Sequence, residues 1–266
     1  MGIKRFISVK ALLLLTVLCS FVTILQPHKP VLYIIGDSTV KNGDGTGNNG
    51  LAGWGTVITP YFDTTKITVL NHAIGGRSSR TFITDGRWDK ILADLRPGDF
   101  VLMQFGHNDG GALDDTARAR GTIRGVGNER KEIYNPITKK QEIVYTYGWY
   151  MRKYANEAKA KGATAIVCSP IPRNIFTNEK TERADTSYGG WAKQVAASAG
   201  AYFIDLNAMV ANEYDAMGPE KVKAFFPGDH THTNEAGAKL NAALVIEGLK
   251  KIPACRLNRY TIKHDE

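Results

Sequence analysis

The sequence predicts an α/β fold, in which helices cover both faces of a five-stranded parallel sheet in a three-layer, doubly wound sandwich. Five short apolar or β-branched runs alternate with segments of helical periodicity. The 266 residues are 43% hydrophobic and 23% charged, which is ordinary for a globular domain that buries a full core. No fixed-period repeat and no long Pro- or Ser-rich linker divides the chain, so we expect one domain over residues 27–266.

The expected strands are the five apolar runs, at residues 31–35, 67–70, 100–104, 163–168 and 201–204. The expected helices follow the 3.6-residue period, at residues 149–160, 190–199, 207–217 and 234–249. Thr233 or Asn234 can cap the last helix, because the side-chain oxygen of either residue can accept a hydrogen bond from the first turn. Such a cap fixes the loop at residues 229–232 directly before this helix.

The amino end has the pattern of an export signal. Lys4, Arg5 and Lys10 precede an uncharged run over residues 11–25. This run is shorter than the roughly twenty residues that span a bilayer. We therefore expect a signal peptide at residues 1–26, a secreted or periplasmic protein, and no stable membrane partner after cleavage. No Ala-x-Ala site is present, so an uncleaved anchor is the alternative.

The segment at residues 110–144 is charged, contains several glycines and is only weakly periodic. It is typical of an insertion, which either lines the rim of a cleft or forms a lid. Cys168 ends an apolar run and is expected to be an unreactive core thiol. In an exported protein it could instead pair with Cys255, and the residues leave both alternatives open.

The formal net charge of +8 is a modest excess. No basic helix with interleaved aromatic residues accompanies it, so we expect no nucleic acid partner. The excess is compatible with an acidic polysaccharide as partner, although solubility alone would also explain it. No Cys/His cluster has zinc spacing, and the glycine-rich stretch at residues 42–50 lacks the Gly-Lys-Ser/Thr of a phosphate loop. We expect no metal, no cofactor and a monomer.

The first candidate for chemistry is Ser38, in a Gly-Asp-Ser-Thr motif directly after the strand expected at residues 31–35. A serine hydroxyl becomes a good nucleophile only when a base lies within hydrogen-bond reach and a third group orients that base. Asp229 and His232, three residues apart, can supply both groups. His230 is the rival base, but it lies only one residue from Asp229. Together these residues predict a serine hydrolase.

Two further segments follow expected strands and can stabilise an oxyanion. Gly75 and Gly76 come after residues 67–70, and Asn108 comes after residues 100–104 in a Gly-His-Asn-Asp motif. Acyl transfer needs preorganised N–H donors that converge on the developing charge. A glycine N–H and the asparagine amide would meet this need.

These four segments, in this order, resemble the SGNH (GDSL-type) hydrolase superfamily. The longer stretches at residues 71–78, 104–111 and 226–233 look like its rhamnogalacturonan acetylesterase branch, and the resemblance covers about residues 31–249. It implies a flavodoxin-like sheet. It also implies Ser38 as nucleophile, His232 as base and Asp229 as orienting acid. The oxyanion hole would comprise the N–H groups of Ser38 and Gly76 and the amide of Asn108.

The expected function is that of a secreted serine esterase that removes O-acetyl groups from plant cell-wall polysaccharide, with acetylated rhamnogalacturonan or pectin as substrate. One alternative is an acetylxylan or other carbohydrate acetylesterase, and another is a lipase, lysophospholipase or thioesterase of the same superfamily. A non-catalytic sugar-binding protein is the alternative from a different class. Arg77, directly after Gly76, is a candidate substrate-binding residue, because a guanidinium can hold a uronate carboxylate. Alternatively, Arg77 could hold the adjacent loop in place.

Overall fold

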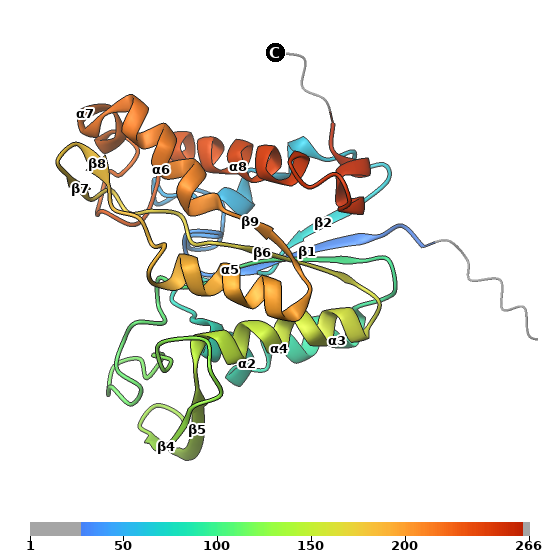
Figure 1. Cartoon of the computed structure of the whole chain (residues 1–266), viewed down its shortest axis with the longest axis vertical. Coiled ribbons are helices and arrows are strands. Elements are labelled where there is room, and N and C mark those ends of the chain that lie inside the picture. The colour runs from blue at the N-terminus through green and yellow to red at the C-terminus, as the bar shows by residue number, and fades with distance from the viewer. Residues whose placement is uncertain (1–27, 263–266) are drawn as a thin grey trace, which may run out of the picture.

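The computed structural model describes residues 28–262, so the predicted signal peptide at residues 1–26 lies outside the described residues. A five-stranded, all-parallel sheet forms the centre of the fold (Figure 1). Its order is β2-β1-β3-β6-β9, which is the flavodoxin-like doubly wound order. The strands are β1 (Val31–Gly36), β2 (Thr68–Asn71), β3 (Phe100–Gln104), β6 (Thr164–Cys168) and β9 (Tyr202–Ile204). The predicted sheet is therefore confirmed, with boundaries shifted by about one residue.

One face of the sheet is covered by α6 (Leu206–Met217) and α8 (Glu235–Lys250), with α7 (Pro219–Lys223) beside them (Figure 1). Leu32 and Ile34 of β1 belong to the apolar cluster on this side, together with Val210 of α6 and Leu249 of α8. Asn234 caps α8 by accepting a hydrogen bond of 3.1 Å from the N–H of Gly237. It was one of the two residues predicted for this cap.

The other face is covered by α2 (Ser79–Thr84), α3 (Arg87–Asp94), α4 (Tyr147–Ala160) and α5 (Tyr188–Ala199). Tyr33 and Ile35 of β1 belong to the cluster on this side, with Trp88 of α3 and Tyr154 of α4. Alternate residues of one strand therefore enter two separate cores. Burial on both faces explains why these strands are continuous apolar runs.

The segment at residues 110–144 contains an antiparallel hairpin of β4 (Arg130–Asn135) and β5 (Lys140–Tyr145). The fully buried Arg80 of α2 fastens this segment to the domain. Its Nε and Nη2 each donate a hydrogen bond of 2.7 Å to the carboxylate of Glu142, and its Nη1 donates bonds of 2.8 Å to the carbonyls of Leu113 and Gly121. The segment is thus joined to α2 by an ion pair and two hydrogen bonds to backbone carbonyls, all from Arg80.

The remaining short elements connect these layers. They are β7 (Phe176–Thr177), β8 (Lys180–Thr181) and the 3-10 turns Trp54–Thr56, Thr59–Tyr61 and Arg256–Tyr260. Cys168 and Cys255 are both buried and free, so the disulfide considered from the sequence is absent here. Burial raises the pKa of both thiols. Over residues 28–262, no helix is both long enough and apolar enough to cross a bilayer.

Candidate active site

Ser38 lies just beyond the carboxyl end of β1, in a turn built by Asp37. The Asp37 carbonyl accepts hydrogen bonds from the N–H groups of Val40 at 3.1 Å and Lys41 at 3.0 Å. The Asp37 carboxylate accepts two more from Thr39, at 2.9 Å and 2.7 Å. Gly36 is required before the turn, because a Cβ there would lie 2.5 Å from the Val40 side chain. The tight turn holds the Ser38 hydroxyl at the sheet edge where open α/β folds bind ligands.

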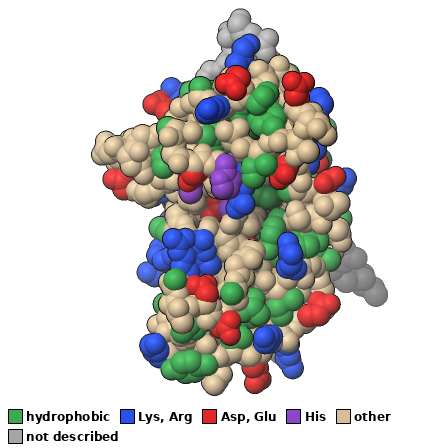
Figure 2. Space-filling view, turned by 90° about the vertical axis from the view of Figure 1, so that its left-hand side faces the viewer, with side chains coloured by type: hydrophobic (Ala, Val, Ile, Leu, Met, Phe, Trp, Pro, Cys, Tyr) green, Lys and Arg blue, Asp and Glu red, His purple; other side chains and the backbone are tan. Residues whose placement is uncertain are grey.

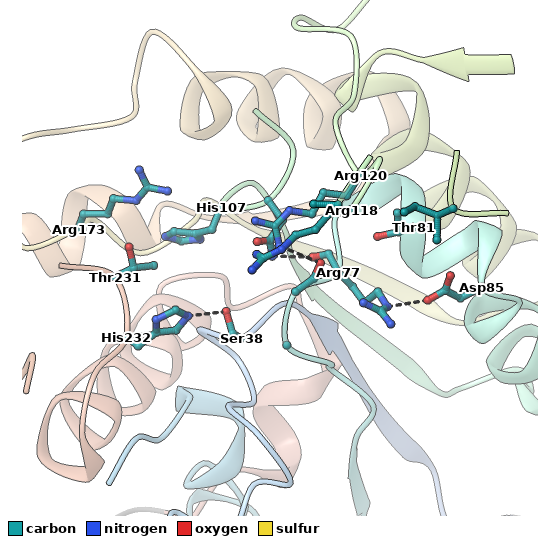
Figure 3. Close-up of a pocket in the computed structure, with 15 residues that line it drawn as sticks. Ser38, Arg77, Thr81, Asp85, His107, Arg118, Arg120, Arg173, Thr231 and His232 are labelled. Carbon is teal, nitrogen blue, oxygen red and sulfur yellow. Dashed lines mark hydrogen bonds and ion pairs between the residues drawn. The ribbon is translucent and has the colours of Figure 1, made fainter. Parts of the chain in front are cut away.

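The structure brings Ser38, His232 and Asp229 into one hydrogen-bonded series, of which Figure 3 shows the contact between Ser38 and His232. His232 Nε2 lies 2.8 Å from Ser38 Oγ, and His232 Nδ1 lies 2.6 Å from Asp229 Oδ2. Hydrogen bonds within the loop before α8 fix its shape. Asp229 Oδ1 also accepts from the N–H groups of Thr231 at 2.6 Å and His232 at 2.8 Å. The three residues therefore have the geometry of nucleophile, base and orienting acid.

The charge state of Asp229 sets the tautomer of His232. Burial acts to raise the pKa of Asp229, but hydrogen bonds from the His232 ring and from two backbone N–H groups outweigh it and lower the pKa to about 2. An ionised carboxylate only accepts hydrogen bonds, so His232 Nδ1 carries the proton. Nε2 is then free to accept the proton of Ser38. The rival base His230 is exposed, and its contact is through its carbonyl, which accepts from the N–H of Asn174.

The glycine pair and Asn108 line the same pocket as Ser38. A Cβ on Gly75 would lie 3.6 Å from the Ser38 Cβ, so this glycine flanks the nucleophile closely. Gly76 has φ +76°, a conformation that glycine adopts without strain. Asn108 is 8% exposed, and its amide donates a hydrogen bond of 2.9 Å to the carbonyl of Arg77. The structure thus places all the predicted oxyanion donors around one cavity, and their roles as donors stay predictions.

Asp109, which the sequence reasoning did not single out, joins the two oxyanion segments. Its buried carboxylate accepts hydrogen bonds from Ser79 at the start of α2, at 3.1 Å from the N–H and 2.5 Å from the hydroxyl. Burial raises the pKa of Asp109 to about 7, against the lowering effect of these bonds. The sequence signal that could have identified Asp109 is its position directly after Asn108.

Asp37 is a second buried acid in this region. It lies close to His107, which belongs to the same Gly-His-Asn-Asp motif as Asn108 and Asp109. Asp37 Oδ2 lies 3.5 Å from His107 Nδ1, and His107 Nε2 lies 3.1 Å from the carbonyl of Ile171. Burial acts to raise the pKa of Asp37, but the neighbouring His107 ring and the hydrogen bonds from Thr39 lower it overall. The Ser38 turn and the Asn108 loop therefore lie side by side at this pair.

The pocket around Ser38 has a volume of about 620 Å³ and is rich in arginine. Figure 2 shows Lys and Arg side chains gathered on the face that carries the histidines. The lining arginines are Arg77, Arg118, Arg120 and Arg173. The predicted substrate residue Arg77 does line the pocket, but its Nε lies 2.6 Å from Asp85 Oδ2 (Figure 3). Among residues 28–262, no group of three or more His, Cys, Asp or Glu side chains could hold a metal ion.

The flavodoxin-like sheet and the Ser38–His232–Asp229 series at its carboxyl edge define an SGNH-type hydrolase of carboxylic esters. The chain belongs to the GDSL-like lipase/acylhydrolase family, whose family model matches residues 34–240. It is 34% identical to the rhamnogalacturonan acetylesterase of Emericella nidulans over 212 residues, which are 79% of this chain and 81% of that protein. It is 33% identical to a probable rhamnogalacturonan acetylesterase of Bacillus subtilis, over 83% of this chain and 93% of that protein.

Solved structures agree on the fold. The YxiM protein of Bacillus subtilis superposes with a TM-score of 0.68 at 28% identity, covering 85% of this chain and 57% of that chain. An acetylxylan esterase from Geobacillus stearothermophilus superposes with a TM-score of 0.56 at 18% identity, covering 83% of this chain and 94% of that chain. The resemblance expected from the four sequence segments is therefore confirmed.

Proposed function

We propose that this protein is a carbohydrate O-acetylesterase that acts on acetylated acidic polysaccharide, with rhamnogalacturonan as the substrate. The observation that carries the proposal is a hydrogen-bonded Ser38–His232–Asp229 series, of which Ser38 and His232 line a pocket together with four arginines. The names of the relatives in Emericella nidulans and Bacillus subtilis support the same substrate.

The chemistry would proceed in two halves. Ser38 Oγ attacks the acetyl carbonyl while His232 Nε2 takes the hydroxyl proton and Asp229 stabilises the imidazolium. His232 then returns this proton to the departing sugar oxygen, which leaves an acetyl-Ser38 intermediate. In the second half, a water molecule gives a proton to His232 and attacks the acetyl carbon. Ser38 then recovers the proton, and acetate is released.

In both halves, the carbonyl oxygen gains negative charge. We assign its stabilisation to the N–H groups of Ser38 and Gly76 and to the side-chain amide of Asn108. One hydrogen of that amide is held by the Arg77 carbonyl, and the second is available to the oxyanion.

The pocket lining argues against a long acyl chain as substrate. Of its fifteen lining residues, Ala117 and Ile137 are the ones with apolar side chains. A lipase or lysophospholipase would need a continuous apolar groove to bury its acyl chain. An acetyl group needs no such groove.

Acetate release from acetylated rhamnogalacturonan, xylan and chitin oligosaccharides tests the proposal. We expect release from the first substrate and its loss in Ser38→Ala, which removes the nucleophile. Longer p-nitrophenyl esters cleaved faster than p-nitrophenyl acetate would favour the lipase alternative. Binding of oligosaccharide without acetate release from the wild type would favour a sugar-binding protein.

We further propose that the protein is exported, because residues 1–26 have the composition of a signal peptide. N-terminal sequencing of the protein recovered from the periplasm or medium tests this. A mature chain that begins near residue 27 is the expected result, and an intact Met1 on membrane-bound protein would indicate an anchor instead.

A further inference from the structure

Two neighbouring arginines in the pocket have no acidic partner. Arg77 pairs with Asp85, but no carboxylate among the described residues lies within 4.0 Å of the guanidinium of Arg118 or Arg120. Arg118 is exposed, and Arg120 is half-buried and donates one hydrogen bond of 3.2 Å to the Gly76 carbonyl. The two side chains therefore present unpaired donors to the cavity that contains Ser38.

A tight turn fixes the backbone that carries both arginines. The Asp115 carboxylate accepts hydrogen bonds from the N–H groups of Ala117 at 3.0 Å, Arg118 at 2.8 Å and Ala119 at 3.0 Å. The same carboxylate forms no ion pair within 4.0 Å with either guanidinium. Ala119 is buried and has φ +41°, a left-handed conformation that is costly for a residue with a Cβ.

The conformation of Ala119 determines where the arginines point. Its methyl group is buried, while the residues on either side, Arg118 and Arg120, both line the pocket (Figure 3). Arg80 holds the same turn from behind, because it donates to the carbonyls of Leu113 and Gly121 on its two sides. The backbone of both arginines is thus preorganised, and the Arg120 guanidinium is also held by the Gly76 carbonyl, which lowers the entropy cost of binding a ligand.

The electrostatics of the pair favour an anion. Partial burial and the nearby charge of Arg118 lower the pKa of Arg120. An anion placed between the two groups would relieve this repulsion. A guanidinium presents two parallel N–H donors that match the two oxygens of a carboxylate.

We infer that Arg118 and Arg120 bind the carboxylate of a uronate residue next to the acetylated sugar, while the acetyl group lies at Ser38. The inference rests on the proposed function, whose substrate class it makes specific. Arg77 is less suited to this task, because Asp85 already occupies its guanidinium and also lies 3.5 Å from Arg87. Recognition of the acid is thus assigned to the segment at residues 110–144.

The test compares acetylated rhamnogalacturonan oligosaccharides with the same material after chemical reduction of its carboxyl groups to alcohols. For Arg118→Gln, we expect the ratio of kcat/KM for acidic over reduced substrate to fall roughly ten- to a hundredfold, the worth of one charge-assisted contact. Arg120→Gln should lower the same ratio. Arg130→Gln is the matched control, because it removes an equal charge from an exposed site of the same segment and should leave the ratio unchanged.

Equal losses on both substrates in Arg118→Gln and Arg120→Gln would overturn the inference. So would a fall in the ratio that appears in Arg77→Gln and not in these two variants.

A binding measurement separates this inference from the proposed activity. In a Ser38→Ala background, calorimetry with the acidic oligosaccharide should show affinity that Arg118→Gln weakens by a similar factor and that added salt also weakens. If this Arg118-dependent binding is found but the wild type releases no acetate, the proposed activity fails and the carboxylate site stands. Affinity that is the same with and without Arg118 overturns the site.

Discussion

Asn108 donates a hydrogen bond of 2.9 Å from its side-chain amide to the backbone carbonyl of Arg77. This bond joins the loop after β3 to the loop that contains the glycine pair. It also fixes the plane of the amide, so that its second hydrogen has a defined direction before substrate binds. Such preorganised donors account for a large part of the rate enhancement in acyl transfer.

The first prediction concerns this amide. Loss of one oxyanion donor typically lowers kcat by about 10²–10³, so Asn108→Ala should fall in that range on p-nitrophenyl acetate with little change in KM. Ser79→Ala is the control, because it weakens the neighbouring contact to Asp109 and leaves the Asn108 amide in place. A loss of equal size in both variants would mean that Asn108 acts by holding the loop.

The second prediction concerns Asp229, which accepts from the His232 ring at 2.6 Å. An asparagine at this position can turn its NH₂ group toward the ring and favour the wrong imidazole tautomer. Asp229→Asn should therefore lower kcat by up to roughly 10⁴, as in other triads. Because hydrogen bonding lowers the pKa of Asp229 to about 2, the carboxylate is ionised at all ordinary assay pH values. Steady-state kinetics near neutral pH checks this, and a decrease below tenfold would contradict the assigned role.

The third prediction concerns the pH dependence of stability and rests on Asp109. Burial raises its pKa from 3.8 to about 7, so the folded protein holds this proton more tightly than the unfolded chain does. The stability that it contributes is full below about pH 4 and is lost as the pH rises through about 7. Asp109→Asn does not titrate. Its free energy of unfolding relative to wild type should therefore rise from pH 4 to pH 7 and then level off, which urea denaturation at several pH values would measure.

A difference between Asp109→Asn and wild type that stays constant over this pH range would show that the carboxyl group is already ionised in the folded state at low pH. The prediction would then be wrong.

The fourth prediction concerns the buried pair of Arg80 and Glu142. Removal of one member of a buried ion pair typically costs about 3–5 kcal/mol, and the Glu142 carboxylate, which is 15% exposed, would keep the hydrogen bond from Asn135. Arg80→Met should lower the free energy of unfolding by this amount, whereas Arg130→Met at an exposed site should change it by less than about 0.5 kcal/mol. The double variant Arg80→Met/Glu142→Met should be more stable than Arg80→Met alone. If the two single losses simply add, the pair is not coupled.

The sheet and the hydrogen-bonded series of Ser38, His232 and Asp229 could be predicted because their residues stand in local sequence patterns. Continuous apolar runs identify strands that are buried on both faces, and Ser38 follows such a run directly. The short helices α2, α3 and α7 were missed, since six, eight and five residues give too few turns for a periodic pattern. The hairpin of β4 and β5 was also missed, because most of its residues are exposed and neither strand has more than three consecutive apolar residues.

The polar contacts that hold the site together could not be found in the sequence. Arg80 looks like any charged residue in a Ser-Arg-Thr context, yet it is fully buried because Glu142, far along the chain, reaches its guanidinium. For Arg77, the sequence predicted the location of the residue but not its partner. Its place beside Gly76 correctly put it at the pocket, but the ion pair with Asp85 depends on how α2 ends. Such partners are determined by tertiary contacts, and no local pattern encodes them.

The serine and the histidine that contact each other lie 194 residues apart in the chain. During synthesis from the amino end, β1 and the turn with Ser38 are complete long before the loop of His232 has been made. Until that loop docks beside β1, the serine has no base and remains an ordinary hydroxyl. The contact between Ser38 and His232 can therefore form only after the loop at residues 229–232 has been made and has docked beside β1.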